Sequence, residues 1–335
     1  MYDSIDEAIK AKLAESQSIL IVSHIRPDGD AVGSLLGLGL ALIRQGKAVQ
    51  LVLADGLPDK YLPLRGSDLV RKIAQGEFDM SIVVDCSDIE RTGSAFSNIS
   101  KPDLNIDHHK TNLNFAALNL VEADSVATAA TLAEHMPSWG LEIDCAVASC
   151  LLTGIIADTI GFRTSNMSAQ ALRLSADLID KGADLSKLYR QTLVSRSFEA
   201  IGFWGAGLNR LGRDGAIVWA SLTLDDRGKI GYPDDDDADL IDILAAIGDA
   251  KIAIIFVEHK NGSIKVSWRA QKGFDVSGIA LSFGGGGHAG AAGVDIQGDL
   301  TEVMDSVIQA TKVFLAETLA GKKILVEEGK GEQKI

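Results

Sequence analysis

Acidic and imidazole side chains gather in three short stretches of the sequence, each of which includes or follows an apolar run. They are His24, Asp28 and Asp30 in "SHIRPDGDA", Asp85 in "IVVDCSD", and Asp107, His108 and His109 in "LNIDHHKTN". Carboxylate and neutral imidazole groups suit manganese, magnesium or zinc as ligands. Neighbouring carboxylates repel each other unless a positive charge lies between them. These stretches therefore contain candidate ligands for divalent cations.

Each stretch also has an interpretation without a metal. A turn in which Asp28 and Asp30 bond only the backbone would explain the first stretch equally well. Asp85 could cap a helix, and the two histidines could be solvated. However, adjacent side chains on an extended chain point to opposite faces. His108 and His109 therefore cannot both be packed in one core.

The candidate ligands lie at the ends of predicted strands. Apolar runs predict strands at 18–24, 48–55, 80–88 and 103–109, and helices at 31–46, 127–135, 145–159 and 168–184. This alternation indicates an α/β fold with a mostly parallel sheet flanked by helices. Ligands bind beyond the carboxyl ends of such strands. Asp158, an acid in an otherwise apolar predicted helix, would be brought to the same place. We therefore expect an acidic cluster for two metal ions, which together can activate water and clamp a phosphoryl group.

The pattern of predicted strands and helices changes after a mixed helical segment. "GAIVWASL" predicts a strand, "DLIDILAAIG" a helix, and "KIAIIFVEHKNGSIKVSWRA" two strands around a tight turn at Asn261-Gly262. We therefore predict one domain over 1–190, a connector over 191–212, and a smaller α/β domain with a mixed sheet over 213–325. The polar end, 326–335, is expected to be disordered. The acidic run 234–237 is expected to be a solvated helix N-terminus.

Composition limits the classes of function. The chain has 335 residues and a net charge of −14, which argues against non-specific binding of long duplex DNA. No apolar run is long enough to cross a bilayer, and the N-terminal segment lacks the features of a signal peptide. Three cysteines without metal-finger spacing fit reduced thiols. A cytoplasmic protein without membrane partners is expected.

The motifs together resemble the DHH phosphoesterases. "SHIRPDGDA", "VVDCSD", "IDHH", "ADT" and "GGGGHAGAAG" occur in the order of that family, and the match covers about residues 15 to 320. "VSWRA" followed by "FGGGGHAGAAG" is similar to the DHH-associated C-terminal domain. The resemblance implies a catalytic DHH domain, a substrate-binding second domain, and an active site in the cleft between them.

The resemblance also assigns metal ligands. His24, Asp28 and Asp85 would hold a first divalent cation, and Asp30, Asp85, His108 and Asp158 a second, with Asp85 bridging both. Manganese is the expected metal, because the ligand set has carboxylates and imidazoles but no thiolate. His109 would face the substrate phosphate as a catalytic residue. Asp107 would orient a histidine.

Substrate-binding residues are expected in the second domain. Gly285, Gly286 and Gly287 would let the backbone approach a ligand closely. Arg269 can pair with a phosphate through two hydrogen bonds, and His288 can donate to a phosphate or stack on a base. Without Arg269 and His288, a flexible loop would be the better interpretation of the glycine run.

The compact two-domain form is similar to the bacterial oligoribonuclease (nanoRNase)/pAp-phosphatase group, which is related to RecJ. The expected enzyme is a hydrolase of very short RNA oligonucleotides, linear dinucleotides such as pApA, or adenosine 3′,5′-bisphosphate. A RecJ-like single-strand exonuclease and an exopolyphosphatase are alternative enzymes, and a nucleotide-binding sensor is the non-enzymatic alternative. The preferred base, the direction of cutting and the oligomeric state, including a homodimer, stay open.

Overall fold

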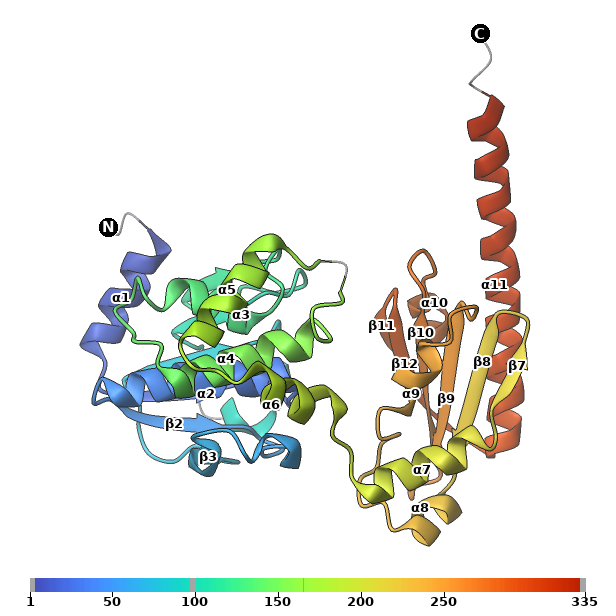
Figure 1. Ribbon diagram of the computed structural model, residues 1–335, viewed down its shortest axis with the longest axis horizontal. Coiled ribbons are helices and arrows are strands. Elements are labelled where there is room, and N and C mark those ends of the chain that lie inside the picture. The colour runs from blue at the N-terminus through green and yellow to red at the C-terminus, as the bar shows by residue number, and fades with distance from the viewer. Residues whose placement is uncertain (1–3, 97–100, 165, 332–335) are drawn as a thin grey trace. The chain divides into compact units, whose positions relative to one another are not determined.

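The chain folds into two compact units in a computed structural model that describes residues 4–96, 101–164 and 166–331 (Figure 1). The units span residues 1–195 and 196–335. The side chains of Phe96, His288 and residues 321–331 lie outside the description. Each unit is built around its own sheet.

The first unit contains a parallel sheet of six strands in the order β3-β2-β1-β4-β5-β6. The strands are β1 (Ser18–Val22), β2 (Ala48–Val52), β3 (Val70–Arg71), β4 (Met80–Val84), β5 (Leu104–Asp107) and β6 (Leu118–Val121). The predicted α/β fold with a parallel sheet is confirmed. The order reverses between β1 and β4, which is the topological switch point where ligands bind in such sheets.

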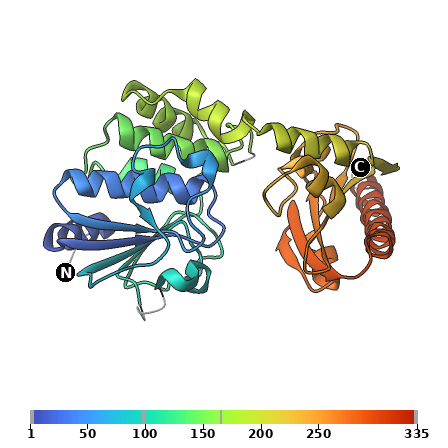
Figure 2. The ribbon, with the colours of Figure 1, turned by 90° about the horizontal axis from the view of Figure 1, so that it is seen from below.

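Helices cover mainly one face of this sheet (Figure 2). They are α1 (Ile5–Glu15), α2 (Gly29–Arg44), α3 (Thr128–His135), α4 (Cys145–Asp158), α5 (Ala169–Asp180) and α6 (Leu185–Tyr189). Ile19 and Ile21 of β1 face these helices, whereas Leu20 and Val22 face a smaller cluster on the opposite side. The 3₁₀ segment η3 (Ile89–Phe96) contributes to that cluster. The branched apolar residues of β1 are therefore buried on both faces, as in most parallel sheets.

Helices α2 and α4 pack closely because glycines face each other. A Cβ atom at Gly33 would overlap the Cys150 carbonyl and lie 2.8 Å from the Gly154 nitrogen. A Cβ atom at Gly154 would lie 2.5 Å from the Ala129 Cβ and 2.7 Å from Oδ1 of Asp30. These glycines therefore allow α2, α3 and α4 to converge on one place.

The second unit contains a mixed sheet of six strands in the order β11-β12-β10-β9-β8-β7. The strands are β7 (Gly212–Asp214), β8 (Ile217–Leu222), β9 (Ile252–Glu258), β10 (Ser263–Ala270), β11 (Gly286–His288) and β12 (Ala291–Gln297). Strands β8 and β9 pair in parallel and the other pairs are antiparallel. The predicted mixed sheet and the hairpin at Asn261-Gly262 are confirmed.

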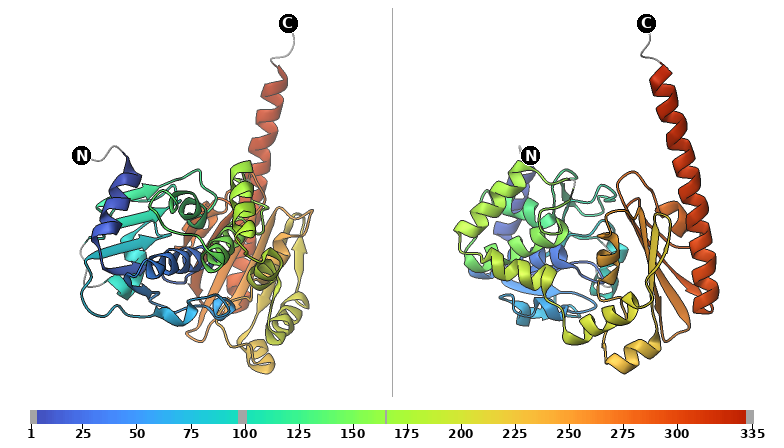
Figure 3. Two further views of the ribbon diagram at one scale, coloured as in Figure 1. Left: turned by 60° about the vertical axis from the view of Figure 1, so that its left-hand side comes forward. Right: turned by 45° about the vertical axis from the view of Figure 1, so that its right-hand side comes forward.

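Both faces of the second sheet are covered. The helices are α7 (Phe198–Leu208), α8 (Leu224–Ile230), α9 (Leu240–Ala245), α10 (Ser277–Ser282) and α11 (Leu300–Gly331). Helix α11 packs on one face through Val303, Val307 and Ile308, and Figure 3 shows it extending beyond the sheet. It continues into the tail for which disorder was expected, because extending a formed helix costs little per residue. Residues 332–335 lie outside the described part.

Among the described helices, none combines the length and the apolar character needed to cross a membrane.

His135 ties the first helix to the rest of the first unit. Its Nδ1 lies 2.8 Å from a carboxylate oxygen of Asp6 in α1, and its Nε2 lies 2.9 Å from one of Glu122. Trp139 donates a further bond of 2.7 Å to Asp6. The hydrogen bond to Glu122, together with Asp6, raises the pKa of His135 to about 9 from 6.5.

Replacing His135 by Gln should therefore destabilise the protein in a pH-dependent way. Because the folded pKa is raised, the stabilisation is fully present below about pH 6.5 and is lost as the pH rises through about 9. Urea unfolding at pH 6.5 and pH 10 should show a smaller difference from wild type at pH 10. Trp139→Phe, which removes an uncharged donor to the same Asp6, is the control and should show the same difference at both values. An equal loss for His135→Gln at both values would contradict the ion pair.

Replacing Gly154 by Ala should destabilise the first unit by about 1–3 kcal/mol, because the new methyl group would overlap the Ala129 and Asp30 side chains. Gly205, inside α7, is a matched control, since a Cβ atom there meets nothing within 4 Å. Gly205→Ala should stabilise by about 0.5–1 kcal/mol through helix propensity. Denaturant unfolding of the two variants checks both signs. Equal effects would show that α2, α3 and α4 are not closely packed at Gly154.

Candidate metal centre

The carboxyl ends of β1, β4 and β5 bring the predicted ligands together at the switch point of the first sheet. His24 follows β1, and Asp28 is the N-cap of α2, where it accepts bonds from the backbone of Asp30 and Ala31. Asp28 therefore makes the backbone bonds that the alternative without a metal required of it, and its Oδ1 accepts both of them. Asp85 directly follows β4.

His24 is held by the backbone and faces two acids. Its Nδ1 donates to the Ile25 carbonyl at 2.8 Å. Its Nε2 lies 3.9 Å from Asp28 and 3.6 Å from Asp85. Burial of the ring opposes its charge, but the nearby Asp85 carboxylate outweighs burial and raises the pKa of His24. Nε2 is thus the atom that could bind a cation.

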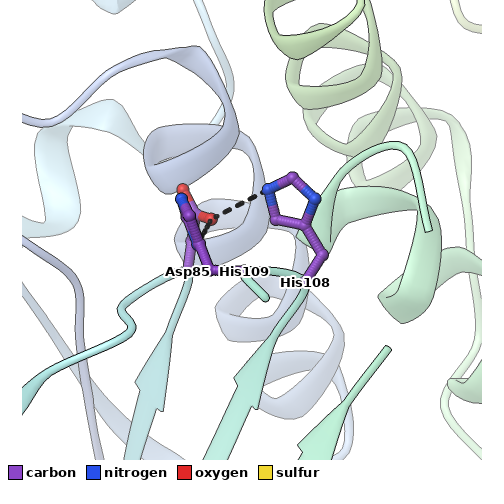
Figure 4. Close-up of side chains that lie close together, drawn as sticks. All are labelled: Asp85, His108 and His109. Carbon is purple, nitrogen blue, oxygen red and sulfur yellow. Dashed lines mark ion pairs between the residues drawn. The ribbon is translucent and has the colours of Figure 1, made fainter. Parts of the chain in front are cut away.

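His108 has the same arrangement at the other carboxylate oxygen of Asp85. Figure 4 shows His108 beside Asp85, with a dashed line for their ion pair. Its Nδ1 lies 3.3 Å from the Ser125 carbonyl. Its Nε2 lies 3.4 Å from Asp158, 3.8 Å from Asp85 and 3.9 Å from Asp30. A backbone carbonyl at one ring nitrogen commonly orients a histidine whose other nitrogen binds a metal.

Asp30 is buried beneath the N-terminus of α3. The backbone N–H groups of Thr128 and Ala129 donate to its two oxygens at 2.6 and 2.9 Å. The Ser34 hydroxyl donates at 3.3 Å. Helix α3 has no side-chain cap of its own, so Asp30 takes that role from another helix.

Asp85 is 2% exposed and lies between His24 and His108. The Thr128 hydroxyl donates to its Oδ1 at 2.9 Å. Its backbone has a φ of 52°, in the left-handed region that residues other than glycine seldom adopt. Such backbone strain is concentrated at functional sites. Asp85 thus turns out of its strand so that its carboxylate reaches both histidines.

Asp107 and His109 form a separate pair. His109 Nδ1 lies 2.7 Å from Oδ1 of the fully buried Asp107. This hydrogen bond raises the pKa of His109 to about 9. The second nitrogen of a histidine held in this way can donate to an anion.

The carboxylates of the cluster disfavour one another's charge. Burial, with the charges of Asp85 and Asp158, raises the pKa of Asp30 well above its usual value. Burial, with Asp85 and Asp28, raises the pKa of Asp158 to about 6. Burial also opposes the charge of Asp85, but the surrounding histidines outweigh it and lower its pKa. Bound cations would relieve this repulsion.

The donor set fits divalent cations. Three groups of side chains each have ligand atoms within 4.8 Å of one another: His24, Asp28 and Asp85; Asp30, His108 and Asp158; and Asp85, His108 and His109. All six residues predicted as ligands belong to these groups. Asp85 belongs to the first and third groups, and its Oδ1 lies 3.8 Å from Nε2 of His108, a member of the second group. His109 joins the third group because its Nδ1 lies 3.8 Å from the same oxygen.

The predicted substrate residues lie on adjoining strands of the second sheet. Arg269 of β10 pairs with Ala291 of β12, and His288 of β11 pairs with the same residue from the other side. Arg269 Nε lies 3.4 Å from Asp242, and its side chain is 37% exposed. Of the glycine run, for which a loop was the alternative, Gly286 and Gly287 lie in strand β11 and Gly284 lies in a turn; Gly287 has a φ of 144°.

Four supporting side chains were missed in the sequence. They are Ser34, Asn105, Asn112 and Thr128. "KTN" directly after the Asp-His-His triplet was the available signal for Asn112. Thr128 bonds Asp85 and Asp30, which precede it by 43 and 98 positions, so no local pattern could have indicated these bonds.

Comparison with known proteins identifies the family. The N-terminal domain of the DHH family matches residues 18–155, and the DHHA1 domain matches residues 220–317. The bifunctional oligoribonuclease and PAP phosphatase NrnA of Thermus thermophilus is 31% identical, over 88% of this chain and 89% of its own length. The chain belongs to the DHH family. As a DHH-family phosphoesterase, it is a hydrolase of phosphoester bonds, and the family depends on metal.

Two further similar proteins match nearly the whole chain. The Mycoplasma genitalium protein of the same name is 30% identical, over 88% of this chain and 92% of its own length. The crystal structure of an exopolyphosphatase-related protein from Bacteroides fragilis has a TM-score of 0.88 at 24% identity, covering 95% of this chain and 98% of that one. This structure supports the fold alone.

The two adjacent histidines should respond differently to replacement. His108→Ala should lower manganese occupancy, measured by elemental analysis after dialysis, because its Nε2 faces three carboxylates. His109→Ala should retain the metal but lower kcat about 10- to 100-fold, since its Nδ1 is engaged by Asp107. Each variant is the other's control. Loss of metal from His109→Ala alone would invert the two roles.

Proposed function

We propose that the protein is a two-metal phosphodiesterase and phosphatase that uses manganese. Its substrates are very short oligoribonucleotides, linear dinucleotides of the pApA kind, and adenosine 3′,5′-bisphosphate. The observation that carries the proposal is the convergence of six candidate ligands, Asp85 among them, in overlapping groups at one end of the sheet. The substrate class is supported by relatives named oligoribonuclease and PAP phosphatase that match nearly the whole chain.

The proposed ligands divide into two sets. His24, Asp28 and Asp85 would hold one cation, and Asp30, His108, Asp158 and the same Asp85 the other. Bound cations would supply Lewis-acid stabilisation of the phosphoryl oxygens and a water of lowered pKa. Manganese is proposed because the donors are oxygens and imidazole nitrogens without thiolate.

The chain's own residues orient the substrate. His109, whose pKa is raised to about 9 by its hydrogen bond to Asp107, would donate to a phosphate oxygen. Asp107 holds its ring through Nδ1. Arg269, on the strand beside β12, and the glycines of β11 would bind a terminal phosphate or base of the substrate. His288 would contribute to the same subsite. A cytoplasmic location, with free thiols, completes the proposal.

A substrate panel tests the proposal. We expect manganese-dependent release of mononucleotides from RNA of two to a few nucleotides, and of phosphate from adenosine 3′,5′-bisphosphate. Chromatography of the products measures both reactions. Full activity after exhaustive chelation would overturn the metal mechanism. Processive cutting of long single strands would indicate a RecJ-like exonuclease, and preferential cleavage of polyphosphate an exopolyphosphatase. Tight nucleotide binding without turnover would indicate a sensor.

Arg269→Ala should weaken the cleavage of dinucleotides far more than that of a small artificial phosphodiester, which offers no second end to hold. We expect the loss of dinucleotide kcat/KM to be about 10- to 100-fold, the value of a charged hydrogen-bonded contact. Lys265→Ala is the matched control, because Lys265 lies on the same strand and carries the same charge. The measurement is kcat/KM against RNA length for the three proteins. Equal losses for both variants would reduce the role of Arg269 to net charge.

A further inference from the structure

Asn112 lies beside the catalytic pair of Asp107 and His109. Its side-chain nitrogen lies 2.5 Å from Oδ2 of Asp107, 2.8 Å from Oδ1 of Asn105 and 3.3 Å from the Cys86 carbonyl. All three partners are acceptors. Its side-chain oxygen accepts the backbone N–H of Asn114 at 2.7 Å. The contacts of both atoms therefore agree on how the amide is oriented.

Asn105 anchors this amide to the neighbouring strand. It is fully buried, and its nitrogen lies 3.2 Å from the Val83 and Cys86 carbonyls, on either side of Asp85. Its oxygen accepts from Asn112. The two amides thus connect the end of β4, which carries Asp85, to the segment after β5, which carries the two histidines.

Asp107 has a different partner on each oxygen. Oδ1 meets His109 Nδ1, and Oδ2 meets Asn112. Because the carboxylate is fully buried, an oxygen without a donor would cost about 1–3 kcal/mol or more and would leave the carboxylate free to rotate. Rotation would move Oδ1 away from the ring of His109. The orientation of His109 therefore depends on a donor at Oδ2.

We propose that Asn112 is a positioning residue that acts through Asp107 on His109. It fixes the plane of the Asp107 carboxylate. Through its bond to Asn105, it also ties that carboxylate to the end of β4. An aspartate of the same shape could not replace it, since a carboxylate has no donor and would repel Asp107 at this distance. The inference rests on the proposed catalytic role of His109 and on no particular RNA substrate.

The test uses full-length protein, Mn²⁺ and bis(4-nitrophenyl) phosphate, a small phosphodiester. Asn112→Ala and the isosteric Asn112→Asp should each lower kcat about 10- to 100-fold, as for other residues that orient a ligand or catalytic group. Manganese affinity, measured by calorimetry, should stay close to wild type, because Asn112 touches none of the six candidate ligands. Asn119→Ala is the control. Asn119 of β6 is also half-buried and bonds Ala116 in the segment before its own strand, so this variant should keep kcat.

A double-mutant cycle separates positioning from structural support. If Asn112 acts through Asp107, then Asn112→Ala should cost little further activity in an Asp107→Asn background. In ¹⁵N-histidine-labelled apoprotein, Asn112→Ala should alter the imidazole signals of His109 and leave those of His135 unchanged.

Three results would overturn the proposal. They are a kcat for Asn112→Ala equal to that of Asn119→Ala, a parallel loss of manganese affinity, and fully additive effects with Asp107→Asn. Unfolding of both Asn112 variants would make it a structural residue and would also overturn the proposal. A wild type that hydrolyses the artificial diester but not short RNA would refute only the proposed substrate, so the two failures can be told apart.

Discussion

Repulsion among carboxylates is the constraint on which the rest of the first unit depends. Asp28, Asp30, Asp85 and Asp158 converge on two histidines at the switch point of the sheet. Asp30 and Asp85 are almost fully withdrawn from water, so solvent screens their charges little. The surroundings compensate with backbone N–H groups, hydroxyl groups and imidazoles. What remains uncompensated is the charge that cations would neutralise.

The supporting fold brings these acids together by removing side chains. Gly33 and Gly154 let α2 and α4 pack closely. The end of α4 and the start of α2 therefore lie beside the N-terminus of α3. That N-terminus carries a partial positive charge, which favours Asp30 in its ionised form. The packing of apolar helices and the electrostatics of the site are thus parts of one arrangement.

The features that could be predicted from the sequence are those that depend on local residue patterns. The parallel sheet followed from branched apolar runs, and the gathering of His24, Asp85 and His108 followed from the rule that strand ends meet at one edge. Asp158 was placed because it stands out in an apolar helix. Strand β11 was not expected, since its partner β12 and not its own glycines makes it a strand. The roles of Thr128 and Asn112 were missed, because they depend on bonds between distant segments.

The cap that Asp30 provides for α3 also links function to the order of folding. Helix α3 has eight residues and would be unstable alone. Its N–H groups meet Asp30 across separations of 98 and 99 residues. Closing so long a loop costs entropy, and these bonds can form only once α2 and α3 have been brought together. The carboxylate therefore reaches its final position only when α3 does, so a partly folded chain has no finished centre to load with metal.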